Sequence, residues 1–179
     1  MVEGGKICDA RSGFRVPGTG AGLRASSYWP PVPGTRHLSP MTEPTTPWSL
    51  ISLPTHSDPR GSITICESGA QIPFAMQRAR WVFGAPANAT RGGHAHHRTA
   101  QLFVAVAGAL TIAVDDGRRT ERVRLDTPSR GLLIPPGVWI DTEEFAPDTV
   151  LLMLASEPHD PADYIRDRAE FEAAVRRAS

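Results

Sequence analysis

Downstream of about residue 47, apolar residues occur in short runs that are separated by turn residues. Strands of a sandwich or barrel give this pattern, whereas helices give longer segments in which apolar residues recur every three or four positions. Asp115-Asp116-Gly117, between two of the runs, is a typical hairpin turn. The chain is therefore predicted to be all-β. The expected strands are residues 49–53, 63–66, 78–83, 101–106, 108–114, 121–125, 132–134 and 149–155.

The periodicity changes toward the C-terminus. Asp160 has the side chain of a helix N-cap, and Pro161 suits the first helical position. Tyr164, Phe171 and Val175 then form a partly apolar face, and two arginines follow where the C-terminus of a helix favours positive charge. The pattern predicts a C-terminal helix that begins near residue 161 and packs against the barrel.

The first part of the chain has a different composition. Residues 1–47 contain seven Pro and seven Gly, a share of about 30% that is typical of low-complexity or disordered segments. They also show no apolar period. We expect a low-complexity leader over residues 1–47 and a single folded domain over residues 48–179.

Composition narrows the functional classes. Nineteen basic and 19 acidic side chains give no net charge, which argues against electrostatic nucleic-acid binding. No apolar run reaches the ~18 residues of a membrane span, and no secretory signal is visible. Cys8 and Cys66 cannot build a disulfide framework. We expect a cytoplasmic protein without nucleic-acid or membrane partners. Because Lys6 is the only lysine, phosphate contacts must come from arginine.

The segment from Arg91 to His97 contains the most informative chemistry. It reads Arg-Gly-Gly-His-Ala-His-His. In a strand, residues two apart share a face, so His94 and His96 are expected to point the same way. Such a pair could bind a metal, act in acid–base catalysis, or be two hydrogen-bonded core residues. His97 is expected to face outward with Ala95.

The metal interpretation can be compared with the cupin pattern, which this region resembles. In that pattern an acidic residue follows His-x-His, and a Pro-x-Gly-x-x-His motif comes later. Here Gln101 stands at the acidic position and Ile140 at the last histidine. A tight divalent site needs about three matched protein ligands. We therefore expect no metal and no other cofactor, with a metal-dependent cupin oxygenase as an alternative.

Without a metal, the two histidines suit proton transfer. Histidine titrates near neutral pH and is the commonest general acid–base group. Enolisation beside a carbonyl needs a base at one carbon and the return of a proton to its neighbour. His94 and His96 on one face could supply both functions.

The same residues support a family resemblance. Arg91-Gly92-Gly93-His94-Ala95-His96, with Gln101 and Asp115-Asp116-Gly117, resembles the WxcM-like cupins, sugar-nucleotide 3,4-ketoisomerases that act on dTDP-4-oxo-6-deoxyglucose. The similarity extends over residues 50–171 and leaves residues 1–47 unmatched. Other matching motifs are Asp58-Pro59-Arg60-Gly61-Ser62, Ile72-Pro73-Phe74, Gly137-Val138-Trp139, Leu154-Ala155-Ser156 and Asp163-Tyr164-Ile165-Arg166.

This resemblance implies a cupin jelly-roll β-barrel, a homodimer, and metal-free conversion of a 4-keto sugar to its 3-keto isomer through an enediol. His94 falls on the position of the family's catalytic base and His96 on that of its partner. Trp139 could stack on the nucleotide base or the sugar, or it could be a core residue. The full set of expected substrate-binding residues is Arg60, Arg78, Arg91, Gln101 and Trp139. For Arg60 and Arg78, a structural ion pair is the alternative.

Several positions depart from the family pattern. Arg80 and Trp81 stand where the family usually has a pair of tyrosines, Ile140 replaces a histidine, and His97 replaces a lysine. The catalytic histidines are thus present while part of their surroundings differs. A non-catalytic cupin module that binds a nucleotide sugar is therefore the alternative to an isomerase.

Overall fold

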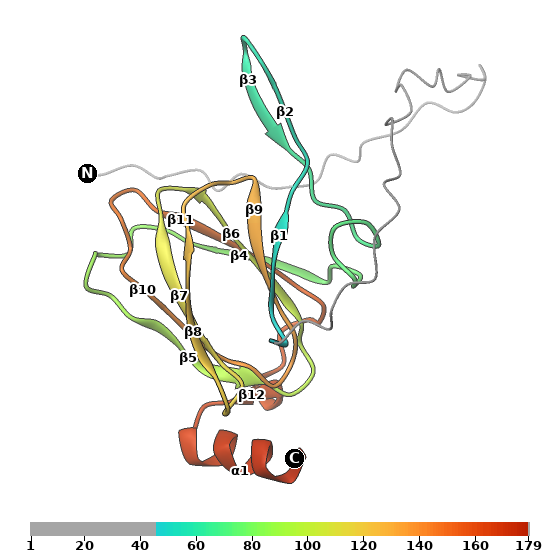
Figure 1. Ribbon diagram of the computed structural model, residues 1–179, viewed down its shortest axis with the longest axis vertical. Helices are drawn as coiled ribbons and strands as arrows, with labels where there is room; N and C mark the ends of the chain where they lie inside the picture. The colour runs from blue at the N-terminus through green and yellow to red at the C-terminus, as the bar shows by residue number, and fades with distance from the viewer. Residues whose placement is uncertain (1–45, 179) are drawn as a thin grey trace, which may run out of the picture. The chain divides into compact units, whose positions relative to one another are not determined.

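The computed structural model of the chain describes residues 46–178, in which two five-stranded sheets face each other (Figure 1). All neighbouring strands within these sheets pair antiparallel. The first sheet has the order β1 (Ser49–Ser52), β9 (Arg130–Ile134), β6 (Gln101–Ala107), β11 (Val150–Ala155) and β4 (Arg78–Val82). The second has the order β12 (Tyr164–Ile165), β5 (Arg91–His96), β10 (Trp139–Glu143), β7 (Leu110–Asp115) and β8 (Thr120–Leu125).

Seven of the eight expected strands correspond closely to strands of these sheets. The eighth is displaced: β3 (Gly61–Thr64) pairs with β2 (Thr55–Asp58) in a separate hairpin that projects from the barrel (Figure 1). Strand β10 was not expected, because its sequence lacks both an apolar run and a clean alternation. The expected leader lies outside the described residues up to residue 45.

The C-terminal helix begins later than the sequence indicates. The Asp160 side chain does cap a turn, but that turn is the short 3₁₀ helix η1 (Pro161–Asp163). Tyr164 then pairs with His96, which places β12 in the second sheet. Helix α1 (Arg168–Ala178) follows. The predicted start near residue 161 is therefore wrong, because pairing between strands distant in sequence overrides the local capping signal.

The strands alternate between an inner and an outer face. The inner faces enclose the main apolar core, which includes Phe103, Ile112 and Leu132. On the outer face of the second sheet, Ala95 and Trp139 are buried against Ile165 of β12 and Phe171 of α1. This helix is too short to cross a membrane, as is η1, and the structure contains no other helix within residues 46–178.

Candidate active site

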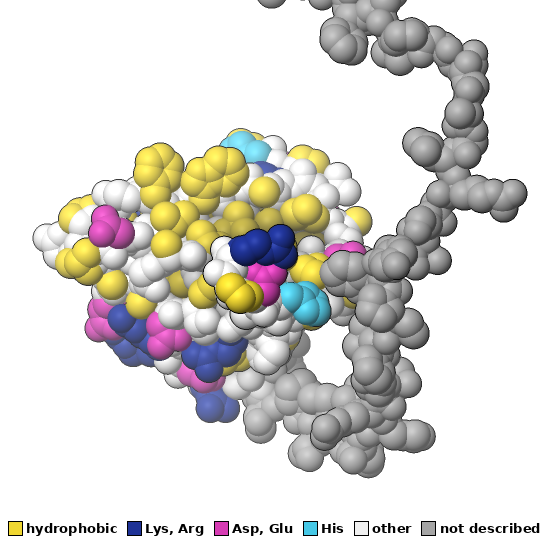
Figure 2. Space-filling model, turned by 90° about the horizontal axis from the view of Figure 1, so that it is seen from above, with side chains coloured by type: hydrophobic (Ala, Val, Ile, Leu, Met, Phe, Trp, Pro, Cys, Tyr) yellow, Lys and Arg dark blue, Asp and Glu magenta, His cyan; other side chains and the backbone are white. Residues whose placement is uncertain are grey.

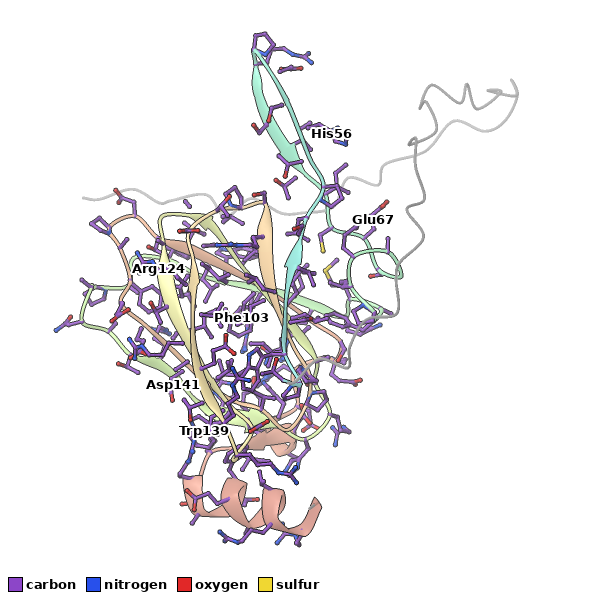
Figure 3. The ribbon with its side chains drawn as sticks, in the orientation of Figure 1. His56, Glu67, Phe103, Arg124, Trp139 and Asp141 are labelled. Carbon is purple, nitrogen blue, oxygen red and sulfur yellow. The ribbon has the colours of Figure 1, made fainter. Side chains whose placement is uncertain are left out.

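A cavity of about 630 Å³ lies between the two sheets, a size typical of small-molecule sites. The second sheet contributes His94 from β5 and Ile140 from β10. The first sheet contributes Arg80, Met153 and Phe103, which are neighbours in one row across β4, β11 and β6. Figure 3 shows Phe103 between the sheets.

A bulge directs His94 into this cavity. His94 pairs with Ile140 and Gly92 with Asp141, so that Gly93 has no counterpart in the ladder. Gly92 and Gly93 both have positive φ, of 108° and 64°, a region that favours glycine. The Gly93 N–H donates to the Asp141 carboxylate at 2.8 Å. The Gly-Gly sequence before the histidines thus serves to orient them.

Replacing Gly92 by alanine is expected to destabilise the fold by at least about 2 kcal/mol. The φ of 108° disfavours a side chain, and a Cβ would clash with the carbonyl oxygen of Ile140. Gly84→Ala is the matched control, since Gly84 also has positive φ but has no atom near its would-be Cβ. Urea denaturation compares the two. Equal losses of stability would contradict the proposed clash.

The His94 ring is fixed in one tautomer. Its Nδ1–H donates to the carbonyl oxygen of Gly92 at 3.0 Å. Its Nε2 is buried and has no hydrogen-bond partner among the described residues. Burial lowers the pKa of His94, and the positive charges of Arg80 and Arg166 lower it further. At neutral pH the ring is therefore uncharged, with its Nε2 lone pair available to a ligand.

The His96 ring is fixed in the same way by a carboxylate. Its Nδ1–H donates to Asp163 at 3.0 Å, and both side chains are only 2% exposed. Burial alone would raise the pKa of Asp163, but hydrogen bonds from Thr99, the Arg98 backbone and His96 lower it overall. Asp163 is thus ionised, and the imidazole proton lies on Nδ1. The buried Nε2 of His96 also has no partner among the described residues.

Acid is expected to destabilise the fold through His96. Burial, followed by the proximity of His94, lowers the pKa of His96 from 6.5 to about 4. The unfolded chain therefore takes up this proton at a higher pH than the folded chain. The free energy of unfolding should fall by up to about 3 kcal/mol as the pH drops from about 6.5 toward 4.

Denaturation in urea across this pH range measures the effect. The His96→Gln variant should show a shallower loss of stability on acidification, because it lacks the shifted group. An unchanged pH dependence in that variant would contradict the assignment to His96.

Tyr164 completes the group around the histidines. Its ring centroid lies 4.3 Å from that of His96 and 4.9 Å from that of His94. Its hydroxyl accepts a hydrogen bond from Arg80 Nη1 at 3.3 Å. The Arg166 guanidinium lies over the ring, 4.4 Å from its centroid. Sequence reasoning placed Tyr164 on a helix face and missed it as a site residue, although the Asp-Tyr-Ile-Arg motif was a signal.

The cavity is positively charged. Three arginines contribute to its lining, namely Arg80, Arg91 and Arg166, whereas no Asp or Glu does so. Arg91 and Arg166 are exposed and Arg80 is half-buried. Across residues 46–178, no three His, Cys, Asp or Glu side chains gather as a set of metal ligands would. The arrangement suits an anionic ligand and proton transfer at the Nε2 atom of His94, with the His96 ring 5.0 Å away, centroid to centroid.

Comparison with known proteins agrees with this geometry. Residues 46–176 match the sequence profile of FdtA, the WxcM-like, C-terminal family. The chain belongs to the WxcM-like family. The resemblance inferred from the sequence is thereby confirmed, as is an all-β cupin fold with a C-terminal helix.

The relatives of this WxcM-like chain are sugar isomerases. It is 35% identical over 118 residues to the TDP-4-oxo-6-deoxy-α-D-glucose-3,4-oxoisomerase of Aneurinibacillus thermoaerophilus. This alignment covers 66% of this chain and 85% of the relative. QdtA, a sugar 3,4-ketoisomerase from Thermoanaerobacterium thermosaccharolyticum solved with TDP, is 30% identical with a TM-score of 0.73, over 75% and 98% of the two chains. The TDP-quinovose 3,4-ketoisomerase WlaRB of Campylobacter jejuni is 32% identical with a TM-score of 0.68, over 70% and 97%.

Not all of the expected substrate-binding residues meet at the cavity of this WxcM-like chain. Arg91 lines it. Gln101 is buried behind Arg80 and accepts a hydrogen bond from Arg80 Nη2 at 3.0 Å. Arg78 contacts Nδ1 of His159, a lining residue, at 3.1 Å. The sequence therefore located this region well, but Gln101 and Arg78 adjoin lining residues rather than line the cavity themselves.

Two of the expected residues lie elsewhere. Trp139 points to the outer face of β10, where its ring centroid is 5.5 Å from that of Phe171 and its indole N–H donates to Asp141. Of the two expectations for Trp139, the structure agrees with a core position rather than with stacking in this cavity, because its neighbour Ile140 takes the inward position. Arg60 lies at the tip of the β2–β3 hairpin with its side chain 89% exposed, paired with Asp58.

Proposed function

We propose that this WxcM-like protein interconverts the 4-keto and 3-keto forms of a TDP-linked 6-deoxy sugar, of the TDP-4-oxo-6-deoxyglucose type. One observation carries the proposal. His94 lines a cavity that has arginines and no carboxylates in its lining, and the ring of a second neutral histidine, His96, lies 5.0 Å from that of His94, centroid to centroid, with both Nε2 atoms unpartnered among the described residues. The activities of the relatives support the same reaction.

The histidines perform the proton transfers. The Nε2 atom of His94 takes the proton from C3, and the electrons of that bond form the C3–C4 double bond of an enediolate. The proton held by His94 is then returned to C4 with His96 as relay, whose neutral Nε2 takes up that proton and gives it to C4, while the proton of the C3 hydroxyl passes to the C4 oxygen. The carbonyl group thus moves from C4 to C3 without any change in composition, and without a metal.

The lowered pKa values of both histidines favour this chemistry at neutral pH. A base must be unprotonated to act, and burial keeps the His94 and His96 rings neutral. The exposed guanidinium groups of Arg91 and Arg166 are suited to the diphosphate of the substrate, because arginine binds phosphate through paired N–H groups.

The proposal includes a homodimer. The β2–β3 hairpin is exposed along almost its whole length and projects from the barrel (Figure 1). Ile63 on this hairpin, Trp81 on β4 and the nearby Phe83 are large apolar residues that are more than 60% exposed. Figure 2 shows hydrophobic side chains gathered over one face of the molecule. Apolar surface of this kind typically forms interfaces between proteins.

The decisive experiment is an assay of the purified protein with TDP-4-oxo-6-deoxyglucose in heavy water, followed by NMR. The expected result is a 3-keto product with deuterium at C4, and deuterium at C3 of the recovered substrate. Absence of product and of exchange, with several nucleotide variants of the substrate, would overturn the proposal. If calorimetry shows binding of the same sugar nucleotide without turnover, the protein is instead a binding module. The departures from the family pattern at Arg80 and Ile140 are the reason for this alternative.

A further inference from the structure

Arg80 is a cation of the cavity, and no carboxylate among residues 46–178 forms an ion pair with it. Its Nη1 donates to the Tyr164 hydroxyl at 3.3 Å and its Nη2 to the Gln101 amide oxygen at 3.0 Å. Both partners are neutral, and Nε is buried without a partner in the described part of the chain. Other arginines, such as Arg98 and Arg122, pair with acidic side chains.

An uncompensated guanidinium between two sheets is costly unless something offsets its charge. Moving a charge out of water is unfavourable, and the low polarity of the surroundings strengthens its attraction to any anion. The two neutral hydrogen bonds fix the orientation of the group without consuming its charge. The charge of Arg80 therefore remains available to an anion that enters the cavity.

The position of Arg80 indicates which negative charge of a substrate it would pair with. Arg91 and Arg166 are exposed, as the diphosphate of a long substrate requires, whereas Arg80 is half-buried. Arg80 also holds the hydroxyl of Tyr164, whose ring lies within 5 Å of both histidine rings, centroid to centroid. Arg80 therefore lies beside the groups that move the protons, where the reacting sugar must be.

We propose that Arg80 stabilises the oxyanion of the enediolate while His94 holds the proton taken from C3. This inference rests on the proposed function. When the C3–H electron pair forms the C3–C4 double bond, the π electrons of the carbonyl move to the C4 oxygen, and the guanidinium pairs with the resulting charge. After the hydroxyl proton moves to the C4 oxygen, the charge lies on the C3 oxygen until C4 is protonated. Arg80 keeps its own protons throughout.

Substitution of Arg80 tests the idea. Arg80→Met and Arg80→Gln remove the charge, and each is expected to lower kcat by about 10²–10³-fold, as for loss of an oxyanion-stabilising group. TDP affinity, measured by calorimetry, should change by less than about threefold, because the diphosphate lies elsewhere. Arg80→Lys retains the charge and should keep at least about tenfold more activity than the neutral variants. Arg124→Met, which alters an exposed arginine on β8, should leave turnover unchanged.

The pH profile separates this function from a structural one. When a neutral residue replaces Arg80, His94 loses one nearby positive charge. Its other neighbours, His96, Tyr164, Arg166 and Asp141, are unchanged. The acid limb of kcat/KM should therefore move to higher pH in Arg80→Met and Arg80→Gln, and stay in place in Arg80→Lys.

A wild-type protein that turns over while both neutral variants keep its kcat would overturn the function of Arg80 and leave the proposed isomerase intact. So would a lysine variant no more active than the neutral ones. A wild-type protein without turnover would overturn the proposed function, and this inference with it.

Discussion

Replacing His94 by glutamine is expected to reduce kcat by about 10²–10⁴-fold, the range typical of losing a general base. Glutamine has similar length and polarity but cannot accept a proton near neutral pH. The Nδ1 of His94 is occupied by the Gly92 carbonyl, so only Nε2 can act as the base. Binding of TDP should persist, because the arginines that are suited to the diphosphate are unchanged.

His97→Gln is the matched control. It makes the same change three residues along, at a side chain that is exposed and does not line the cavity. Its kcat should equal that of the wild-type protein. Exchange of the C3 proton with heavy water, followed by NMR, measures the proton-transfer step directly. Exchange at the wild-type rate in His94→Gln would contradict the assignment and point to His96 as the base.

The proximity of His94 and His96, whose ring centroids lie 5.0 Å apart, can be predicted from the sequence because the relevant rule is local. Residues two apart in a strand share a face, and the glycines before His94 mark a backbone irregularity. The strands themselves are predictable for the same reason, since apolar runs separated by turn residues leave little choice. Both inferences need only a few consecutive residues.

The features that the sequence does not reveal depend on pairing between distant segments. Trp139 and Ile140 are both apolar, and only the register of β10 against His94 decides which one faces the cavity. Asp160 and Pro161 form a valid capping signal, yet the pairing of Tyr164 with His96 converts the following residues to a strand. The contact of Asp163 with His96 spans 67 positions in the chain and leaves no local pattern.

Gln101 illustrates a further limit. At the position of a cupin acid, its side chain is readily interpreted as a weak ligand or a substrate contact. In the structure its amide oxygen accepts a hydrogen bond from Arg80, which itself departs from the family pattern. The function of one unusual residue thus depends on another, and neither can be interpreted alone.

Replacing Asp163 by asparagine is expected to lower kcat by about 10²–10⁴-fold, a loss comparable to that of carboxylates that orient a catalytic histidine. One oxygen of the ionised carboxylate accepts hydrogen bonds from His96 Nδ1–H and from the Thr99 hydroxyl. The other oxygen accepts a hydrogen bond from the Arg98 backbone N–H. An asparagine amide that turns its NH₂ group toward His96 favours the opposite tautomer. The proton then lies on Nε2, and His96 no longer has a lone pair there to take a proton from the neighbouring His94.

The same substitution should cost about 3–5 kcal/mol of stability, because a buried charged partner is lost. Asp160→Asn is the matched control: Asp160 is a nearby carboxylate at the surface, and asparagine can replace it as the cap of η1. That variant should keep its activity and lose much less stability than Asp163→Asn. The ¹⁵N chemical shifts of His96 report the tautomer independently of turnover. Because catalysis is attributed to the orientation of the imidazole, an Asp163→Asn protein that loses activity while the proton of His96 stays on Nδ1 would contradict this mechanism.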